Sequence, residues 1–316
     1  MKVTYKMLNS LLLLAIFLCI SPTIQVPPPP TPTSVTISQI DCPLKDFFRE
    51  ARSLECEQMR TLLKLYESCK DAKDASGRTA AMFIAGNTQM TAHDSKTQRD
   101  YYDGKAAFCI QVLHAFDAVW VDTQDNGGNT AISWASANGM PNLLETLLTL
   151  PRKEDDNSKS ELLETTEKVR RSTPLHAAVA HNHFEAASVL VEHGANVRAK
   201  DIDGQTPAMK AALNKRTDIL GRLLTADPGA ADDISLTEWT TCHFGVYAKS
   251  VEVISLLLSV HGCNLDAKDK DGHTPYILST IVGAEDVAYL LREAKINAIE
   301  EDHKDWSSRR NDFEEM

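Results

Sequence analysis

The sequence predicts an all-α fold, a solenoid in which pairs of short helices stack on one another. The first observation is a repeat, because a threonine recurs at intervals of 33, 34 and 34 residues. The second is the content of each interval, two apolar segments that are too short to form stable helices alone. Each helix must therefore bury its apolar face against a neighbour, and stacked repeats provide that neighbour. The four threonines are Thr173, Thr206, Thr240 and Thr274.

The clearest copy of the repeat lies between Ser172 and Lys200. Its first helix is expected to begin after Thr173, a favourable N-cap, with Pro174 at the first position, where a missing N–H costs nothing. Its second helix is expected to end at Gly194, which can adopt the left-handed conformation that closes a helix. This copy therefore predicts both ends of one helix-turn-helix unit.

Weaker copies precede this one. They begin at Thr130 and Thr79, and a degenerate first copy begins at Lys45, 34 residues before Thr79. Thr-Pro-Leu-His at the head of a unit with this period resembles the ankyrin repeat, a β-turn followed by two helices. The resemblance implies an ankyrin-repeat solenoid of about six to seven helix-turn-helix units linked by β-hairpin turns. This domain is expected to span residues 41–299.

The ends of the chain predict separate segments. Residues 1–25 resemble a secretory signal peptide, with Lys2 and Lys6 before a ten-residue apolar run that is too short to span a bilayer comfortably. An uncleaved signal anchor is the alternative, because no Ala-x-Ala cleavage site is present. Residues 26–40 are expected to form a stiff, proline-rich linker. Residues 300–316 are expected to form an acidic C-terminal tail.

The net charge of the chain bears on its partners. Lysine and arginine number 33 and aspartate and glutamate 44, so the net charge is −11, and it becomes −13 if Lys2 and Lys6 are removed with a leader. This balance argues against nucleic acid and against an anionic membrane surface as the partner. The expected partner is another protein, with membrane contact only if the N-terminal segment is uncleaved.

Two intervals are longer than the repeat and predict insertions. Thr79 to Thr130 is 51 residues, and its excess is expected near residues 87–105 as a polar loop. Thr130 to Thr173 is 43 residues, and its excess is expected in the charged stretch 152–169. Insertions in a solenoid project as loops on one side, which is often the binding side.

Six cysteines remain outside the leader, an even number that permits three disulfides in a secreted chain. Cys56 and Cys69 are expected to flank one helix, roughly 20 Å apart along its axis and beyond disulfide reach. Cys42 paired with either of them is more plausible, whereas Cys109 and Cys242 are expected to be buried thiols. The disulfide state stays open for Cys42, Cys56, Cys69, Cys109, Cys242 and Cys263.

No motif in the sequence predicts catalysis, a cofactor or a metal site. The sequence contains no Gly-x-Ser-x-Gly, no glycine-rich phosphate loop and no zinc spacing of cysteine and histidine. His176 and His243 share one slot after the threonine, and the resemblance implies that they bond backbone and neighbouring turns. His181 and His183 are two apart on a predicted helix and would point to different faces, which disfavours chelation.

Asp-Gly pairs ahead of two threonine heads predict tight turns. Gly204 and Gly272 are expected to take positive φ there. Calcium loops are disfavoured, because a calcium loop needs a further acidic position and a later glutamate. The unit headed by Thr240 lacks Asp-Gly, so its turn is expected to be distorted.

The resemblance implies that partner contacts lie at the hairpin tips before each threonine and two turns into each first helix. Trp239 is the strongest candidate, because a tryptophan is costly to leave in water and valuable when buried in an interface. Packing of Trp239 against the neighbouring tip is the alternative. The candidate partner-binding residues are Asn126, Asn129, Asn138, Arg170, Ser172, His181, Ile202, Asp203, Gln205, Asn214, Leu236, Trp239, Tyr247, Lys270, Asp271 and His273.

These observations favour a non-enzymatic protein–protein interaction scaffold that is secreted or resides in the secretory pathway, with no cofactor. One alternative is a membrane-tethered adaptor, in which residues 1–25 remain as an anchor. The other is an enzyme built into the insertion at residues 87–105.

Overall fold

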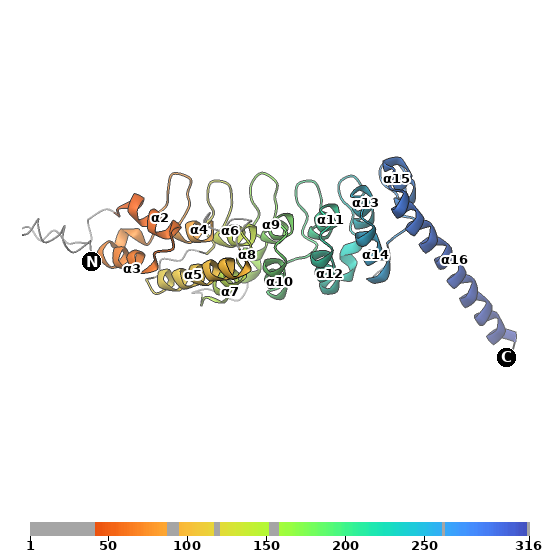
Figure 1. Ribbon diagram of the computed structural model, residues 1–316, viewed down its shortest axis with the longest axis horizontal. Coiled ribbons are helices and arrows are strands. Elements are labelled where there is room, and N and C mark those ends of the chain that lie inside the picture. Colours follow the sequence, from red (N-terminus) through yellow and green to blue (C-terminus); the bar gives the residue numbers. More distant parts are fainter. Residues whose placement is uncertain (1–41, 87–94, 117–120, 152–157, 261–262, 315–316) are drawn as a thin grey trace, which may run out of the picture. The chain divides into compact units, whose positions relative to one another are not determined.

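The described part of the chain is all α-helical, as the sequence predicts. It contains 15 α-helices and two short 3-10 helices, and no strand occurs in it. The predicted leader (1–25) and proline-rich linker (26–40) lie outside it. The computed structural model describes residues 42–86, 95–116, 121–151, 158–260 and 263–314, except for the side chains of 158–160 and 301–314 (Figure 1).

Most of the helices form seven pairs, each with an inner and an outer helix. Inner helices pack against the inner helices of neighbouring pairs and outer helices against outer ones, so the pairs stack in two layers (Figure 1). The predicted helix-turn-helix repeat is therefore confirmed. The pairs are α2 (Leu44–Arg52) with α3 (Cys56–Leu65), α4 (Ala80–Ala85) with α5 (Lys96–His114), α6 (Ala131–Ala137) with α7 (Pro141–Thr149), α9 (Pro174–Ala180) with α10 (Phe184–Glu192), α11 (Pro207–Leu213) with α12 (Thr217–Ala226), α13 (Thr241–Tyr247) with α14 (Val251–Val260), and α15 (Pro275–Val282) with α16 (Glu285–Glu314).

Every predicted threonine head is the N-cap of an inner helix. At five of the six heads the threonine hydroxyl accepts the N–H of the third helical residue, which satisfies one of the donors that a helix start leaves free. Thr240 instead bonds the ring of His243. Gly194 follows α10 with φ +89°, as predicted for a helix end. The caps are Thr79, Thr130, Thr173, Thr206, Thr240 and Thr274.

The first pair differs from the others at its start. Helix α2 begins at Leu44 with Pro43 as its N-cap, so the predicted head at Lys45 lies inside the helix and no side chain caps it. Helix α3 ends at Leu65, and Cys69 lies in a separate 3-10 helix (Glu67–Cys69). The expectation that one helix runs between Cys56 and Cys69 is therefore wrong.

The first predicted insertion is largely helical where the structure describes it. Residues 96–105 form the N-terminal half of α5, whose N-cap Ser95 accepts the N–H of Gln98. The expectation of a projecting polar loop is wrong here, because these residues are helical and Asp103 among them is buried. Residues 87–94 lie outside the described residues.

Asp103 is a buried carboxylate that caps a helix of the next pair. Helix α7 has Met140 as its N-cap and no capping side chain of its own. Asp103 supplies the missing acceptor from α5, since its Oδ2 accepts the N–H of Asn142 at 2.8 Å and its Oδ1 that of Leu143 at 2.9 Å. The contact joins α5 to α7, because the Asp103 side chain accepts two backbone N–H groups that the start of α7 leaves free.

We expect Asp103→Ala to lower the free energy of unfolding by about 2 kcal/mol, because it leaves two N–H groups at the start of α7 without a buried acceptor. Asp100→Ala is the matched control, since Asp100 is exposed on the same helix. Urea denaturation of the two variants measures the difference. Equal stabilities would contradict the capping role of Asp103.

The second insertion and the predicted tail also contain helix. Helix α8 (Ser158–Leu163) lies within the insertion, and Leu162 and Leu163 are buried, whereas residues 152–157 lie outside the described residues. Helix α16 continues from Glu285 to Glu314 and so runs through most of the expected acidic tail.

The six cysteines form three disulfides. Cys42–Cys69 is one of the pairings that the sequence favoured, with Cα atoms 5.0 Å apart. Cys56–Cys109 joins α3 to α5, and Cys242–Cys263 joins α13 to the segment after α14. The expectation that Cys109 and Cys242 are buried thiols is wrong. Stacking brings residues 53 and 21 positions apart in sequence to Cα separations of 4.9 and 5.6 Å.

Candidate functional site

A turn precedes each inner helix from α4 onward, and it has five residues everywhere except before α9, where it has six (167–172). In four of these turns the first residue is an aspartate whose Oδ1 accepts the backbone N–H groups of the third and fifth residues. The N–H of the aspartate donates to the C=O of the fifth residue, which closes the turn. Glycine occupies the fourth position with positive φ, as predicted for Gly204 and Gly272. The four aspartates are Asp74, Asp125, Asp201 and Asp269.

Serine replaces aspartate in the turn before Thr240. The Oγ of Ser235 accepts the N–H groups of Thr237 and Trp239, and Glu238 takes the glycine position with φ +61°. The expected distortion of this turn is therefore wrong, because a hydroxyl can accept the same two bonds as a carboxylate. The turn before Thr173 uses Glu167, whose carboxylate accepts the N–H groups of Val169 and Arg170.

Successive turns are joined by backbone hydrogen bonds, and we call this row of turns the tip ladder. In every turn after the first, the second residue donates its N–H to a carbonyl of the preceding turn, at 2.8 to 3.4 Å. The turns are therefore fixed relative to one another by backbone as well as by the helices beneath them. The bonds run from Asn126 to Ser76, from Lys168 to Gly127, from Ile202 to Arg170, from Leu236 to Asp203 and from Lys270 to Thr237.

A pair of glycines tests the tip ladder. A Cβ on Gly204 would lie 2.8 Å from the backbone N of Leu236, whereas a Cβ on Gly272 would meet nothing within 4 Å. The two φ angles are similar, +70° and +80°. We expect Gly272→Ala to cost about 1 kcal/mol for the left-handed backbone alone, and Gly204→Ala about 2 to 3 kcal/mol because the next turn must also move. Thermal unfolding of both variants measures this, and equal costs would contradict the ladder.

The histidines that share one slot are structural, as the resemblance implies. The Nδ1 atoms of His176 and His243 accept the N–H groups of Thr173 and Thr240. Their Nε2–H groups then donate to the carbonyls of Gln205 and His273 in the following turn, at 3.0 and 3.2 Å. Burial lowers the pKa of His176 to about 4 and also lowers the pKa of His243. Both rings are therefore neutral connectors between units at neutral pH.

The candidate partner-binding residues all lie at the surface, in the tip ladder or at the ends of inner helices. Asn138 is also used between units, because its amide donates to the carbonyl of Ala85 at 3.0 Å. The exposed members are Asn126, Arg170, His181, Ile202, Asp203, Asn214, Leu236, Tyr247, Lys270 and Asp271, and the half-buried members are Asn129, Asn138, Ser172, Gln205, Trp239 and His273.

Trp239 packs against its own inner helix. Its ring lies 5.3 Å from that of Phe244, edge to face, and 5.4 Å from that of Tyr247. Phe244 is buried and Tyr247 is 53% exposed, so the tryptophan connects the core to an exposed aromatic surface on α13. Helix α13, rather than the neighbouring tip, supplies these ring contacts.

Two clusters resemble metal sites. His181 and His183 flank the turn between α9 and α10 rather than lying on one helix, and their rings stack 6.2 Å apart. The Nε2 of His183 is hydrogen-bonded to the carbonyl of Ala137. Asp269, Asp271 and His273 bring ligand atoms within 4.8 Å of one another. The Asp269 carboxylate already accepts two backbone N–H groups of its own turn, as the Asp201 carboxylate does.

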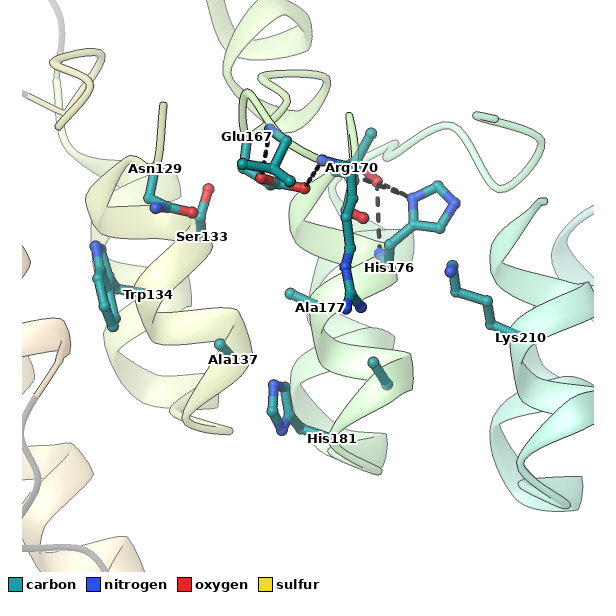
Figure 2. Close-up of a pocket in the computed structure, with 14 residues that line it drawn as sticks. Asn129, Ser133, Trp134, Ala137, Glu167, Arg170, His176, Ala177, His181 and Lys210 are labelled. Atoms are coloured by element: carbon teal, nitrogen blue, oxygen red, sulfur yellow. Dashed lines mark hydrogen bonds between the residues drawn. The ribbon is translucent and has the colours of Figure 1, made fainter. Parts of the chain in front are cut away.

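A groove lies below the tip ladder, between the inner helices α6, α9 and α11 (Figure 2). It encloses about 360 Å³, and Trp134 and Lys210 stand on its two sides. Its floor is formed by small side chains of α6 and α9, namely Ala137, Ala177 and Ala180. The groove includes the predicted residues Asn129, Arg170, Ser172 and His181.

The prediction from sequence missed Trp134, Ala177 and Lys210 as parts of this groove. They lie four residues before the predicted positions Asn138, His181 and Asn214, and residues four apart share a helix face. The same helical periodicity therefore gives the signal that could have found them.

The fold and the tip ladder define the class of this protein, a helical repeat protein with a continuous exposed edge. The family described as "Ankyrin repeats (3 copies)" matches residues 153–233. The chain is 34% identical to the fowlpox virus ankyrin repeat protein FPV223 over 103 residues, which are 33% of this chain and 70% of that protein. The chain therefore belongs to the ankyrin-repeat family.

Other relatives match this chain over a smaller share of their own length. Identity is 31% over 122 residues to mouse Ankyrin repeat and SOCS box protein 11, covering 39% of this chain and 37% of the relative. It is 28% over 131 residues to human Rabankyrin-5, covering 40% of this chain and 11% of the relative. The chain thus spans well under two thirds of the length of these relatives.

Proposed function

We propose that this protein is a non-enzymatic scaffold that binds another protein through its tip ladder and the exposed ends of its inner helices. The observation that carries the proposal is the tip ladder, which holds exposed side chains of successive units in a fixed row. Ankyrin repeats are typically binding modules, and a rigid row of variable side chains suits recognition of a protein surface. The exposed apolar side chains of Ile202 and Leu236 in this row, and of Tyr247 at the end of α13, supply hydrophobic contacts.

Capture of proteins from the surrounding fluid by the full chain tests this proposal. We expect alanine substitutions on the tip ladder and α13 to remove the captured partner, and substitutions on outer helices to leave it. If the captured partner were lost with both sets of substitutions, or with neither set, the proposed binding surface would be contradicted. The test variant is Ile202→Ala/Leu236→Ala/Tyr247→Ala, and the matched control is Val260→Ala/Tyr289→Ala/Ile296→Ala, whose side chains are also exposed and apolar.

We further propose that the protein is secreted or works in the secretory pathway. All six cysteines outside residues 1–25 are paired, a pattern typical of oxidising compartments. None of the described helices has the length and apolar character that a membrane span requires. The alternative, a membrane-tethered adaptor, depends on residues 1–25.

N-terminal sequencing of the mature protein separates these two possibilities. A mature chain that begins near Ile24 supports secretion, because the apolar run has then been removed. A chain that retains residues 11–20 supports the tethered adaptor and contradicts a cleaved leader.

A further inference from the structure

The groove between α6, α9 and α11 is less acidic than the chain as a whole. The chain carries a net charge of −11. The residues that line the groove include two cations, Arg170 and Lys210, and one carboxylate, Glu167. An acidic protein repels an anionic ligand over most of its surface, so a cation without a carboxylate partner marks the place where such a ligand can bind.

The charges in this groove differ in whether they already have partners. The carboxylate of Glu167 accepts the N–H groups of Val169 and Arg170, so both of its oxygens already have hydrogen-bond partners in the turn. Lys210 pairs with the buried carboxylate of Asp201 at 2.6 Å. The guanidinium of Arg170, in contrast, forms no ion pair with a residue in the described part of the chain. Among the described residues, Arg170 is therefore the groove cation that has no carboxylate partner.

The position of Arg170 directs its charge into the groove. Figure 2 shows its side chain extending from the turn down along α9 until the guanidinium lies beside Ala177. Alanines on α6 and α9 keep the floor low, so a polypeptide segment can approach the guanidinium closely. Val169, which is 74% exposed, and the half-buried Trp134 provide apolar contacts on the rim.

We propose that the groove binds an extended segment of the partner protein through an acidic side chain that pairs with Arg170. A planar guanidinium and a carboxylate can form two parallel hydrogen bonds, which makes this pair more specific than a lysine contact. Apolar residues beside the acidic one contact Val169 and Trp134. The inference rests on the proposed function and specifies the chemistry of the partner.

Selection of displayed random peptides on the immobilised full chain tests this inference. We expect the selected peptides to be enriched in aspartate and glutamate, and the enrichment to disappear with Arg170→Glu. Arg52→Glu is the matched control and is expected to keep the enrichment, because Arg52 is exposed on α2 and does not line the groove. Unfolding temperatures of both variants show whether the fold is retained.

A synthetic copy of the most enriched peptide then measures how much Arg170 contributes to the binding affinity. We expect Arg170→Ala to weaken its binding at least about tenfold, and replacement of its acidic residues by their amides to have a similar effect. The full chain with Arg52→Ala should bind like the unchanged protein. Fluorescence anisotropy of the labelled peptide measures all of these affinities.

Three results would overturn the inference. They are selection without acidic enrichment, acidic enrichment that survives Arg170→Glu, and a failure of the full chain to select any peptide. Each would leave the proposed function standing, because capture of a folded partner and its loss in the variant with alanine at Ile202, Leu236 and Tyr247 are measured separately. The proposed function itself would be contradicted if the full chain captured no partner, or if the variant with the three alanines still captured it.

Discussion

Replacing Cys56 and Cys109 together by alanine is expected to lower the free energy of unfolding by about 4 kcal/mol. The disulfide closes a loop of 53 residues that includes α4 and most of α5, so its loss releases much conformational freedom in the unfolded chain. Both cysteines are buried, so alanine leaves no unpaired polar group behind. Urea denaturation of the variant and the unchanged chain measures the difference.

The effect should be confined to one part of the helix stack. Because each unit contacts mainly its neighbours, hydrogen exchange should become faster in α2 to α5 and change little in α11 and α13. Replacing Cys242 and Cys263 by alanine is the matched comparison, with a shorter loop of 21 residues and an expected cost of about 3 kcal/mol at the other end. Unchanged stability in both variants would contradict the structural role of the disulfides.

Stability is expected to fall with acidification because of His176. The ring is 1% exposed, both nitrogens are hydrogen-bonded in the neutral form, and burial lowers its pKa to about 4. Nearby Asp201 raises this pKa and Lys210 lowers it, both less than burial does. Unfolding restores a pKa near the ordinary value of 6.5. The unfolded chain therefore binds a proton that the folded chain rejects, and stability present above pH 6.5 is lost as the pH falls toward 4.

We expect this single group to remove about 3 kcal/mol between pH 7 and pH 4, from a pKa difference of roughly 2.5 units. His176→Met is the informative variant, because Met209 fills the same slot in the next unit and its sulfur accepts the N–H of Thr206. The difference between the two stability curves cancels the carboxylates that titrate in this range. If the stability of the unchanged protein and of the His176→Met variant fell equally between pH 7 and pH 4, His176 would not be the cause of the loss.

Those features of the fold that depend on neighbours in sequence could be predicted. Thr173 and Pro174 start a helix, and Gly194 ends one, because the hydrogen bonds involved join residues a few positions apart. The period of the threonine heads then implied stacking, since helices this short require neighbours. The inner and outer rows follow from these two facts.

Features that depend on stacking itself could not be predicted. Asp103 lay in a stretch that read as a polar loop, and its role appears only when α5 lies against the start of α7. The Cys56–Cys109 pair likewise joins two helices of different units. Ser235 shows a different limit, because a serine and a left-handed glutamate can replace Asp-Gly in a turn without changing its hydrogen bonds.

The candidate site was predictable in its location but not in its chemistry. The resemblance placed Arg170 and His181 at the surface, and the structure puts both of them beside one groove. The charge state of that groove required knowledge of which groups were already paired. Lys210 is held by Asp201, whereas Arg170 is not held by any described residue, and no sequence pattern distinguishes them.

Amide hydrogen exchange at the second residue of each turn tests the tip ladder most directly. Within its own turn the N–H of Ile202 or Leu236 has no acceptor, and its hydrogen bond goes to the preceding turn. Residue-resolved NMR of the full chain should therefore find these amides exchanging at least about a hundredfold more slowly than an unprotected peptide, although both side chains are exposed. Exchange at the unprotected rate would show that the turns are not joined, and the fixed row of side chains on which the proposed binding surface depends would not exist.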